Sequence, residues 1–490
     1  MNVVLALDQG TTGSTCLVFD ATGRVVGRGY REITQYYPQP GWVEHDPLEL
    51  VDHTVEAARE ALTAAGVTAG DVRAIGLTNQ RETAIVWDPN QPRAVPRAIV
   101  WQDRRTADRC AALPADEIGR VTGLAADPYF SGTKFEWLRR EHGERNTALG
   151  TVDTWLLWNL TGGATYATDP TNASRTMLFD IDKRTWSAEM GALFNVPIAA
   201  LPEVRPSSGS FGVTSPRFFG AAIPIAGVCG DQQAALFGQG CYAAGQGKVT
   251  YGTGAFLLLN TGDQRPSTGG GLLATLACDK RGQPCYASEA AIFVAGAALQ
   301  WMRDGLGLIA TADESETLAR AVASTDGVYF VPALTGLGAP HWEPAARGTI
   351  VGLTRGTSRA HLVRAALEAM AYSTGDVLGA MRAAGGVGAT MDQLRVDGGA
   401  TANDWLMQFQ ADVLDLPVER PDLVETTAAG AACLAGLAVG VWSTPDAFLA
   451  GRRFTTFVPG AGRAAAQAGA AGWVRAVQTT LYWARIFKDA

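Results

Sequence analysis

A chain of 490 residues is too long for one ordinary hydrophobic core, and 47% hydrophobic with 18% charged residues is typical of a well-packed globular protein with two or more domains. The net charge of −8, without any run of lysine or arginine, argues against nucleic acid as a partner. Since no apolar stretch reaches the roughly 20 residues that span a bilayer, we expect no membrane insertion.

The cysteines and the amino terminus indicate a compartment. The seven cysteines are scattered and form neither a Cys-x-x-Cys pair nor a Cys/His cluster: Cys16, Cys110, Cys229, Cys241, Cys278, Cys285 and Cys433. A disulfide framework or a structural zinc site is therefore not expected. The start, MNVVLALDQG, lacks the basic residues and the cleavage site of a signal peptide. These features favour a reducing, cytoplasmic location.

The amino-terminal residues predict three strands and a polar hairpin. Residues 3–7 are apolar and rich in valine, and residues 16–19 and 24–30 continue the pattern. Between the first two strands, residues 8–15 read DQGTTGST. The chain therefore opens as strand, hydroxyl-rich hairpin, strand, strand. A helix is expected over residues 47–65, with Asp46 as its N-cap and Pro47 at its first position.

Two short stretches further along place charged and aromatic residues at strand ends. Residues 72–78 predict a buried strand that leads into Asn79-Gln80-Arg81-Glu82. Residues 84–87 and 98–101 predict further short strands, the second ending at Trp101. The adjacent charges of Arg81 and Glu82 could be a solvated pair. Alternatively, a guanidinium fork, a carboxylate and an aromatic wall would bind a small polyol.

The middle of the chain contains a strand, a tight turn and a helix. Residues 223–240 read IPIAGVCGDQQAALFGQG, which places Asp231 at the carboxyl end of a strand. In open α/β folds ligands bind at that end. Asp231 could cap the helix, as aspartate does well, or could act as a base for proton transfer. This stretch leaves both interpretations open.

The second half of the chain repeats the opening pattern. Residues 247–250 predict a strand, Tyr251-Gly252-Thr253-Gly254 a tight turn and residues 255–259 another strand, about half the chain after the first hairpin. A later strand at 394–396 again leads into a glycine turn, and 425–439 predict an alanine-rich helix. We interpret this as an internal duplication of one α/β unit, with an amino-terminal domain over residues 1–240 and a carboxy-terminal domain over 241–490.

The two glycine-threonine hairpins are candidates for phosphate binding. Successive backbone N–H groups in such turns form an anion nest, and Thr11, Thr12 and Thr253 add hydroxyl donors. Asp8 could hold Mg²⁺ through water. Either hairpin alone could be an ordinary turn, but their duplication favours phosphate binding. No G-x-x-x-x-G-K sequence is present, so the chain is not a P-loop enzyme.

Eleven motifs occur in order between about residue 4 and about residue 445: LALDQGTTGST, YYPQPGWVEHDP, GLTNQRET, AIVWQDRRTA, DPYFSGTKFEWL, GTVDTWLLW, TDPTNASRTMLFD, GDQQAALFGQ, TYGTGAFLLLNTG, VPALTGLGAPHWEPAARGTIVGLTRG and RVDGGATANDWLMQFQAD. With them the chain resembles the FGGY family of carbohydrate kinases, and within it the members that act on glycerol. The resemblance implies an α/β fold of two actin/hexokinase-like (ribonuclease H-like) domains with an interdomain cleft. It also implies ATP and Mg²⁺ as cofactors and a homodimer or homotetramer.

The resemblance implies roles for individual residues. Asp231 corresponds to the base that accepts the proton of the terminal glycerol hydroxyl. Residues that correspond to glycerol contacts are Arg81, Glu82, Tyr129, Asp231 and Gln232, with Trp101 and Phe256 along the carbon side. Residues that correspond to nucleotide contacts are Thr11, Thr12, Gly13, Thr253, Gly296, Gln300, Gly399 and Asn403. Alternatively, Tyr129 and Trp101 are core aromatics, and Gly296 eases helix packing.

The chain also departs from the family. Members commonly carry arginine at the position of Thr15 and serine at that of Gly13, which predicts a weakened nucleotide site here. Residues 217–222 lack the glycine-rich basic pattern of a fructose 1,6-bisphosphate site. Two alternatives stay open: a kinase of this family acting on a pentulose or tetritol, and a non-catalytic, actin-like nucleotide switch.

Overall fold

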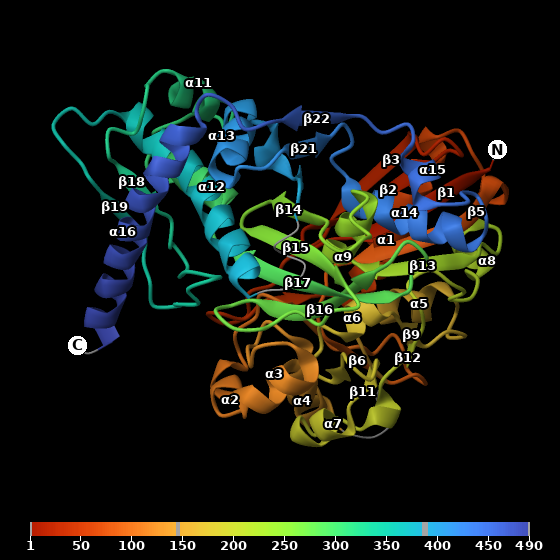
Figure 1. Ribbon diagram of the computed structural model, residues 1–490. Helices are drawn as coiled ribbons and strands as arrows, with labels where there is room; N and C mark the ends of the chain where they lie inside the picture. Colours follow the sequence, from red (N-terminus) through yellow and green to blue (C-terminus); the bar gives the residue numbers. More distant parts are fainter. Residues whose placement is uncertain (1, 144–147, 385–390, 489–490) are drawn as a thin grey trace. The chain divides into compact units, whose positions relative to one another are not determined.

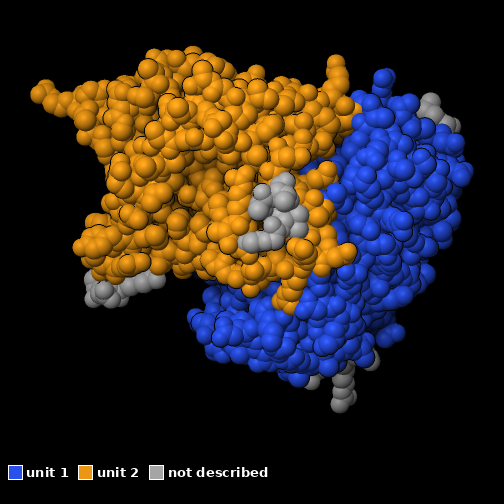
Figure 2. Space-filling model, viewed as in Figure 1, with its two compact units in different colours: residues 1–243, 274–287, 425–451 blue, residues 244–273, 288–424, 452–490 orange. Residues whose placement is uncertain are grey.

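The computed structural model describes all residues except 1, 144–147, 385–390 and 489–490 (Figure 1). The chain divides into two compact units, each made of separate stretches of sequence (Figure 2). Unit 1 comprises residues 1–243, 274–287 and 425–451, and unit 2 comprises residues 244–273, 288–424 and 452–490. Among the described residues, no helix has the length and apolar character needed to cross a membrane.

Unit 1 is built on a five-stranded sheet. The strand order is β13-β5-β1-β2-β3. Strands β13, β5 and β1 run parallel, and β1-β2-β3 form an antiparallel meander. The bounds are β1 Val3–Gln9, β2 Gly13–Phe19, β3 Val25–Glu32, β5 Val72–Asn79 and β13 Ile225–Gly230. β2 begins at Gly13, before the expected start at Cys16, because its ladder with β1 continues through Ser14 and Thr15.

Helix α1, Pro47–Ala64, forms as the sequence predicts. The Asp46 carboxylate accepts a hydrogen bond from the Leu48 backbone N–H at 2.9 Å, and Pro47 occupies the first turn. Apolar residues recur at helical spacing and are buried with one face of the sheet, among them Leu50 and Val55. The helix thereby closes one side of the unit 1 core.

Helix α14, Thr426–Ala438, packs on the same sheet from a distant part of the chain, beside β1 and β5 in Figure 1. A Cβ on Gly76 of β5 would lie 2.1 Å from the Ala431 carbonyl oxygen of α14. A Cβ on Gly430 of α14 would lie 1.9 Å from the Ala234 carbonyl oxygen. Since no side chain fits at these distances, glycines set the close packing of α14, as expected for residues 425–439.

Short elements complete unit 1. Small two-stranded pairs are β4 Glu44–His45 with β7 Ala98–Ile99, β6 Ile85–Trp87 with β8 Ala148–Gly150, β9 Ala167–Thr168 with β12 Glu203–Val204, and β10 Phe179–Asp180 with β11 Thr185–Trp186. The other helices are α2 Ala107–Ala111, α3 Ala115–Thr122, α4 Ser131–His142, α5 Val152–Leu160, α6 Pro170–Ala173, α7 Ala188–Leu193, α8 Pro216–Phe219, α9 Asp231–Gly238 and α15 Pro445–Leu449. Short 3₁₀ turns are η1 Ala69–Asp71 and η2 Ile198–Ala200. The strand expected to end at Trp101 stops at Ile99, so Trp101 lies in a turn.

The second sheet has seven strands in the order β16-β17-β15-β14-β20-β21-β22. The bounds are β14 Gly247–Tyr251, β15 Ala255–Gly262, β16 Leu273–Cys278, β17 Pro284–Ile292, β20 Leu394–Asp397, β21 Val418–Pro421 and β22 Phe454–Phe457. β14 pairs antiparallel with β15 and parallel with β20, which runs parallel to β21. The row β15-β14-β20-β21 thus repeats the directions of β2-β1-β5-β13, which confirms the expected duplication. The division at residues 240 and 241 stays a prediction.

Helices surround the core of unit 2. They are α10 Gly296–Asp304, α11 Glu314–Arg320, α12 Arg359–Ala383, α13 Asp404–Leu414 and α16 Arg463–Lys488, with η4 Gly399–Ala402 and the pair β18 Tyr329–Val331 with β19 Thr349–Val351. Val249, Leu257 and Val396 of the sheet are fully buried with Leu367 of α12 and Leu406 of α13. This core holds β14 and β20 side by side, so their carboxyl ends form one edge.

Candidate active site

Three parallel strands of unit 1 end at the same level. Asn79, the last residue of β5, is paired with Gln9 at the end of β1 and with Gly230 at the end of β13. The next residues of the chain, Gly10, Gln80 and Asp231, therefore start from one edge of the sheet. Carboxyl ends of parallel strands are where α/β folds bind ligands, so this edge is the candidate site.

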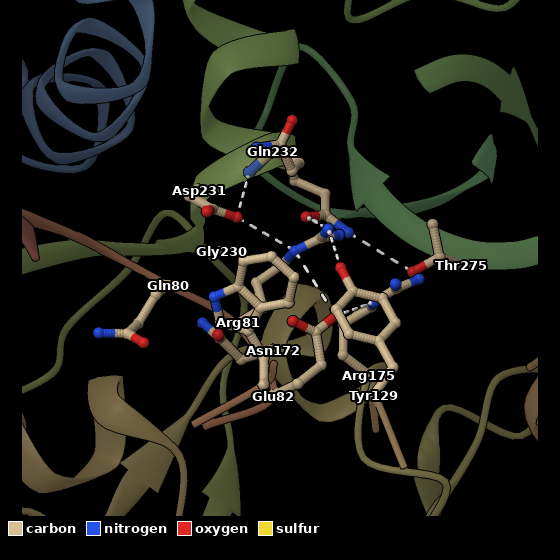
Figure 3. Close-up of polar contacts among 12 residues, drawn as sticks. Gln80, Arg81, Glu82, Tyr129, Asn172, Arg175, Gly230, Asp231, Gln232 and Thr275 are labelled. Atoms are coloured by element: carbon tan, nitrogen blue, oxygen red, sulfur yellow. Dashed lines mark hydrogen bonds and ion pairs between the residues drawn. The ribbon is translucent and has the colours of Figure 1, made fainter. Parts of the chain in front are cut away.

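Arg81 lies at the centre of this edge (Figure 3). Its Nε is 3.1 Å from Oδ1 of Asp231 and 3.8 Å from Oε1 of Glu82. Its Nη1 donates to Gln233 Oε1 at 3.1 Å and its Nη2 to the Tyr129 hydroxyl at 3.4 Å. The side chain is 2% exposed, so the guanidinium is fixed by partners from three segments. Arg81 and Glu82 are therefore not the solvated pair that the sequence left open.

Glu82 is buried and held from both sides. Arg175 Nε lies 2.6 Å from Glu82 Oε1, with the Arg175 side chain fully buried. The Glu82 backbone has φ +65°, a conformation that costs free energy for a residue with a Cβ, and its carbonyl accepts a 2.9 Å bond from Ser131 Oγ. Two guanidiniums at these distances hold the Glu82 carboxylate in one orientation.

Arg175 reaches Glu82 because a short helix is anchored to the sheet. The Asp169 carboxylate caps α6 by accepting from the backbone N–H groups of Thr171 and Asn172, with Pro170 in the first turn. Asn172 exchanges two hydrogen bonds, 2.9 and 3.1 Å, with Asn79 at the end of β5. Burial raises the pKa of Asp169. The cap and the amide pair fix the position from which the chain delivers Arg175.

Aromatic rings line the other side of the Arg81–Glu82 pair. The rings of Trp101 and Tyr129 meet edge to face with centroids 5.5 Å apart. The guanidinium carbon of Arg175 lies 5.6 Å from the centre of the Tyr129 ring. Lys134 is buried and donates to the Tyr129 carbonyl oxygen at 2.7 Å, and burial lowers the pKa of its amine to about 8. These contacts fix the Tyr129 ring beside Arg81, so it is not only a core aromatic.

Asp231 is the first residue of α9, and Gly230 occupies the N-cap position. Its Oδ1 accepts a 2.7 Å hydrogen bond from the Gln232 backbone N–H, and the side chain is 29% exposed. Gln232 is half-buried in the same turn. Unlike Arg81, Glu82 and Arg175, Asp231 combines a fixed carboxylate with access from solvent, which a group that removes a substrate proton needs.

Asp8 fits the expected metal ligand by its charge environment. It lies on β1, is half-buried, and has a pKa raised to about 8 by burial first and then by the charges of Asp231 and Glu425. Neighbouring carboxylates that repel one another are relieved by a cation, and oxygen ligands suit Mg²⁺. No group of three His, Cys, Asp or Glu residues in the described parts of the chain forms a complete metal cluster.

The first hairpin is held by side chains around it. Trp101 Nε1 donates to Thr11 Oγ1 at 2.9 Å, while Thr12 is exposed. A Cβ on Gly13 would lie 2.6 Å from both the Tyr30 hydroxyl and the Arg31 carbonyl oxygen. The neighbouring strand β3 therefore requires glycine at position 13, which explains physically why serine is absent there.

The corresponding edge of unit 2 has a different character. Thr253, between β14 and β15, is exposed, as are Gln300 and Gly399. The hairpin carbonyls of Gly252 and Thr253 accept bonds of 2.8 to 3.0 Å from the first residues around α10. A Cβ on Gly296 would lie 2.6 Å from the Gly252 carbonyl oxygen. The absence of a side chain at position 296 therefore leaves room for the hairpin backbone. This agrees with the alternative that Gly296 eases helix packing.

Asn403 and Phe256 complete the predicted residues of unit 2. Asn403 is the N-cap of α13, where its Oδ1 accepts from the Leu406 N–H at 2.8 Å. Phe256 lies half-buried on β15, paired with Thr250. The structure therefore gives the position of both residues in the fold, and their contacts with ligands stay predictions.

Unit 1 thus brings together Arg81, Glu82, Tyr129 and Asp231, with Trp101 joined to them through Tyr129. Sequence reasoning missed Arg175, Lys134 and Gln233 as parts of this site. Arg175 stands in the motif TDPTNASRTMLFD, whose Asp-Pro pair indicates a helix start, but its pairing with Glu82 across 93 positions leaves no local signal.

The chain is similar in sequence and in fold to known carbohydrate kinases. Residues 3–238 match the N-terminal domain model of the FGGY family of carbohydrate kinases, and residues 247–439 match its C-terminal domain model. The chain is 51% identical to a glycerol kinase of Bordetella parapertussis, covering 98% of both chains, and 53% identical to glycerol kinase 2 of Thermotoga maritima, covering 91% and 92%. The crystal structure of Plasmodium falciparum glycerol kinase with ADP, 34% identical, superposes with a TM-score of 0.90 over 98% of each chain.

Proposed function

The chain belongs to the FGGY family of carbohydrate kinases, and from that premise we propose that it transfers the terminal phosphoryl group of ATP to glycerol, giving sn-glycerol 3-phosphate. The observation that carries the proposal is the buried set of Arg81, Glu82 and Arg175 beside the partly open Asp231. A small polyol needs donors and acceptors fixed in advance, together with an apolar wall. Relatives that are about half identical over their full length and are named glycerol kinases support the same substrate.

We assign each side chain a task in this reaction. Arg81 donates to glycerol oxygens, Glu82 accepts from glycerol hydroxyls, and the Trp101 and Tyr129 rings cover the carbon chain. Gln232 is a further hydroxyl partner, and Phe256 is a proposed apolar contact from unit 2. Buried ion pairs hold Arg81 and Glu82 in place before the substrate arrives. Glycerol binding therefore costs little side-chain conformational entropy.

Asp231 is the proposed base. Its carboxylate accepts the proton of the terminal hydroxyl as that oxygen bonds to the γ-phosphorus of ATP and the bond from this phosphorus to the departing ADP breaks. Arg81 at 3.1 Å keeps the carboxylate oriented. In phosphoryl transfer most of the rate comes from placement and charge stabilisation. Mg²⁺, when bound, neutralises charge on the phosphate oxygens, and Asp8 is the residue that would hold it, through water.

The nucleotide is assigned to the two hairpins and the unit 2 edge. Thr11, Thr12, Gly13 and Thr253 offer backbone N–H groups and hydroxyls for phosphate oxygens. Gly296, Gln300, Gly399 and Asn403 are the proposed contacts for the rest of the nucleotide. The exposure of Thr12, Thr253, Gln300 and Gly399 supports this assignment, because each is open to a ligand.

Two further proposals concern the location and the assembly of the protein. All seven cysteines are buried in the described part of the chain. Their scattered spacing in the sequence supports a reducing, cytoplasmic location. We also propose a homodimer or homotetramer, on the family resemblance alone, which sedimentation or light scattering would test.

The test is an ATP-consumption assay with the purified enzyme. Glycerol, erythritol, xylulose and dihydroxyacetone are each supplied with ATP and Mg²⁺, and the product is identified by phosphorus NMR. We expect kcat/KM to be highest for glycerol by at least about tenfold. A higher kcat/KM for a ketose or for erythritol would show that the chain acts on another substrate of the family. ATP binding without turnover of any acceptor would favour the non-catalytic switch.

A further inference from the structure

A ring of hydrogen bonds joins the first hairpin to the segment that carries Arg81 and Glu82. Gln35 Nε2 donates to the Thr11 carbonyl at 2.7 Å, and Gln35 Oε1 lies 2.9 Å from His45 Nε2. His45 Nδ1 lies 3.4 Å from Gln80 Nε2, whose own Oε1 accepts from Thr83 Oγ1 at 2.8 Å.

The ring closes through Trp101. The Trp101 backbone N–H donates to Thr83 Oγ1 at 3.3 Å, and its indole Nε1 donates to Thr11 Oγ1 at 2.9 Å. His45 and Thr83 are fully buried and Gln80 is 1% exposed. The polar atoms of this ring therefore have to be satisfied inside the protein.

The partners determine the state of the His45 ring. Gln35 uses its amide nitrogen on Thr11, so its oxygen is an acceptor and His45 Nε2 carries the hydrogen. Gln80 Nε2 can only donate, and three atoms lie within reach of its two hydrogens: Gln9 Oε1, the Gly10 carbonyl oxygen and His45 Nδ1. His45 Nδ1 is therefore the bare nitrogen, and a second proton there would point at the Gln80 amide hydrogens.

We propose that His45, as a neutral imidazole protonated at Nε2, is a positioning residue that holds the Thr11 hairpin and the Gln80–Thr83 segment in fixed register. The inference rests on the proposed function, because Thr11 is assigned to the nucleotide and Arg81, Glu82 and Trp101 to glycerol. His45 touches neither substrate. Its contribution is to fix the phosphate side and the glycerol side of unit 1 relative to each other.

Burial agrees with this state. It lowers the pKa of His45 from 6.5 to about 4, so the ring stays neutral at neutral pH. By contrast His53, on α1, is half-buried and bonds through Nδ1 to the Glu32 carbonyl outside the ring. His53 therefore serves as a matched control in the same unit.

The first test is the tautomer, measured by NMR of protein labelled with nitrogen-15 in its five histidines. Spectra of a His45→Phe variant assign the His45 signals by their loss. We expect one ring nitrogen of pyrrole type at Nε2, one bare nitrogen at Nδ1, and no titration between pH 6 and pH 8. A hydrogen on Nδ1, or a midpoint inside that range, would overturn the proposal. This result does not depend on which substrate the enzyme uses.

The second test separates kcat from KM. His45→Phe keeps the ring volume and removes both hydrogen bonds. The residues assigned to glycerol and to phosphate remain, but their positions relative to each other are no longer fixed. Misplacement on the order of 1 Å costs up to about a hundredfold in rate. We expect kcat to fall by at least about tenfold while both KM values change by less than about threefold, with His53→Gln unchanged.

Two conservative variants restore one bond each. His45→Gln can place an amide N–H toward Gln35, and His45→Asn can place an acceptor toward Gln80. We expect both to have kcat values between those of His45→Phe and the wild type. Active-site concentration is taken from glycerol-binding stoichiometry, so that unfolded protein does not count as slow enzyme. Equal kcat in His45→Phe and the wild type would overturn the proposal, as would a loss confined to KM. A wild type that does not phosphorylate glycerol would instead refute the proposed function.

Discussion

The two units carry different kinds of side chains at the ends of their corresponding strands. In unit 1, the edge after β1, β5 and β13 holds charged side chains that are almost fully buried, such as Arg81 and Glu82. In unit 2, the edge after β14 and β20 offers glycines and hydroxyls that are exposed, such as Thr253 and Gly399. The strand directions are the same in both.

A duplicated topology therefore places the strand ends alike in both units, while the side chains at those ends differ in chemistry. Buried charges that are already paired offer oriented partners to a small polyol at low entropic cost. Exposed backbone and hydroxyl groups suit a large, charged ligand that brings its own counter-ion. If this contrast holds, substitutions at the unit 1 edge affect glycerol and substitutions at the unit 2 edge affect the nucleotide.

Asp231→Asn should have the largest effect. The amide keeps the size of the side chain but accepts no proton, so we expect kcat with glycerol to fall by at least about a hundredfold, as for the loss of a general base. Asp116→Asn, at an exposed position of α3, is the control and should leave kcat unchanged. Near wild-type kcat in Asp231→Asn would show that Asp231 is not the base.

Arg81→Gln should act on glycerol and not on the nucleotide. A hydrogen bond from a charged donor contributes about 1.5–3 kcal/mol, so glycerol KM should rise by at least about tenfold. ADP affinity, measured by calorimetry without glycerol, should not change. The control is Arg120→Gln, whose side chain is 65% exposed and pairs with Glu189. Equal damage to ADP affinity would show that this edge serves the nucleotide as well.

Thr253→Val is the converse test on unit 2. It removes one exposed hydroxyl and keeps the branched shape, and a neutral hydrogen bond contributes about 0.5–1.5 kcal/mol. We expect the ADP dissociation constant to rise between about twofold and tenfold, while glycerol KM stays within about twofold. The comparison between the two edges would fail if the glycerol KM changed more than the ADP affinity.

Thr15→Arg should have the smallest effect, and it is a gain. Thr15 on β2 lies directly opposite Asp8 on β1, so a guanidinium introduced there shares the side of the sheet on which Asp8 lies. ADP binding should tighten by a few-fold at low salt, and the gain should shrink as ionic strength rises. Calorimetry at two salt concentrations decides. Unchanged or weaker binding at both would mean that position 15 does not face the phosphates.

Local sequence pattern predicted the elements of both edges but not the partners of the buried charges. The hairpins, α1 and the Asp231 turn follow from residue type and spacing within short windows. The pairs Arg175–Glu82 and His45–Gln80 join residues 93 and 35 positions apart, so only the folded chain brings them together. At Gly296 the sequence pointed to the residue but not to its neighbour in the fold, which is the hairpin carbonyl of Gly252, and its nucleotide contact stays a prediction.

Recognition of glycerol by the buried charges of unit 1 is tested directly by comparing glycerol with 1,2-propanediol, which lacks one terminal hydroxyl, in wild-type enzyme. If Arg81 and Glu82, the latter held by Arg175, bind the glycerol hydroxyls, the missing group leaves a buried polar partner unsatisfied. Sites of this kind reject such analogues by about 10⁴-fold or more. We predict that kcat/KM for 1,2-propanediol is at least about a thousandfold below that for glycerol. A ratio within about tenfold would contradict recognition of glycerol by the buried charges of unit 1.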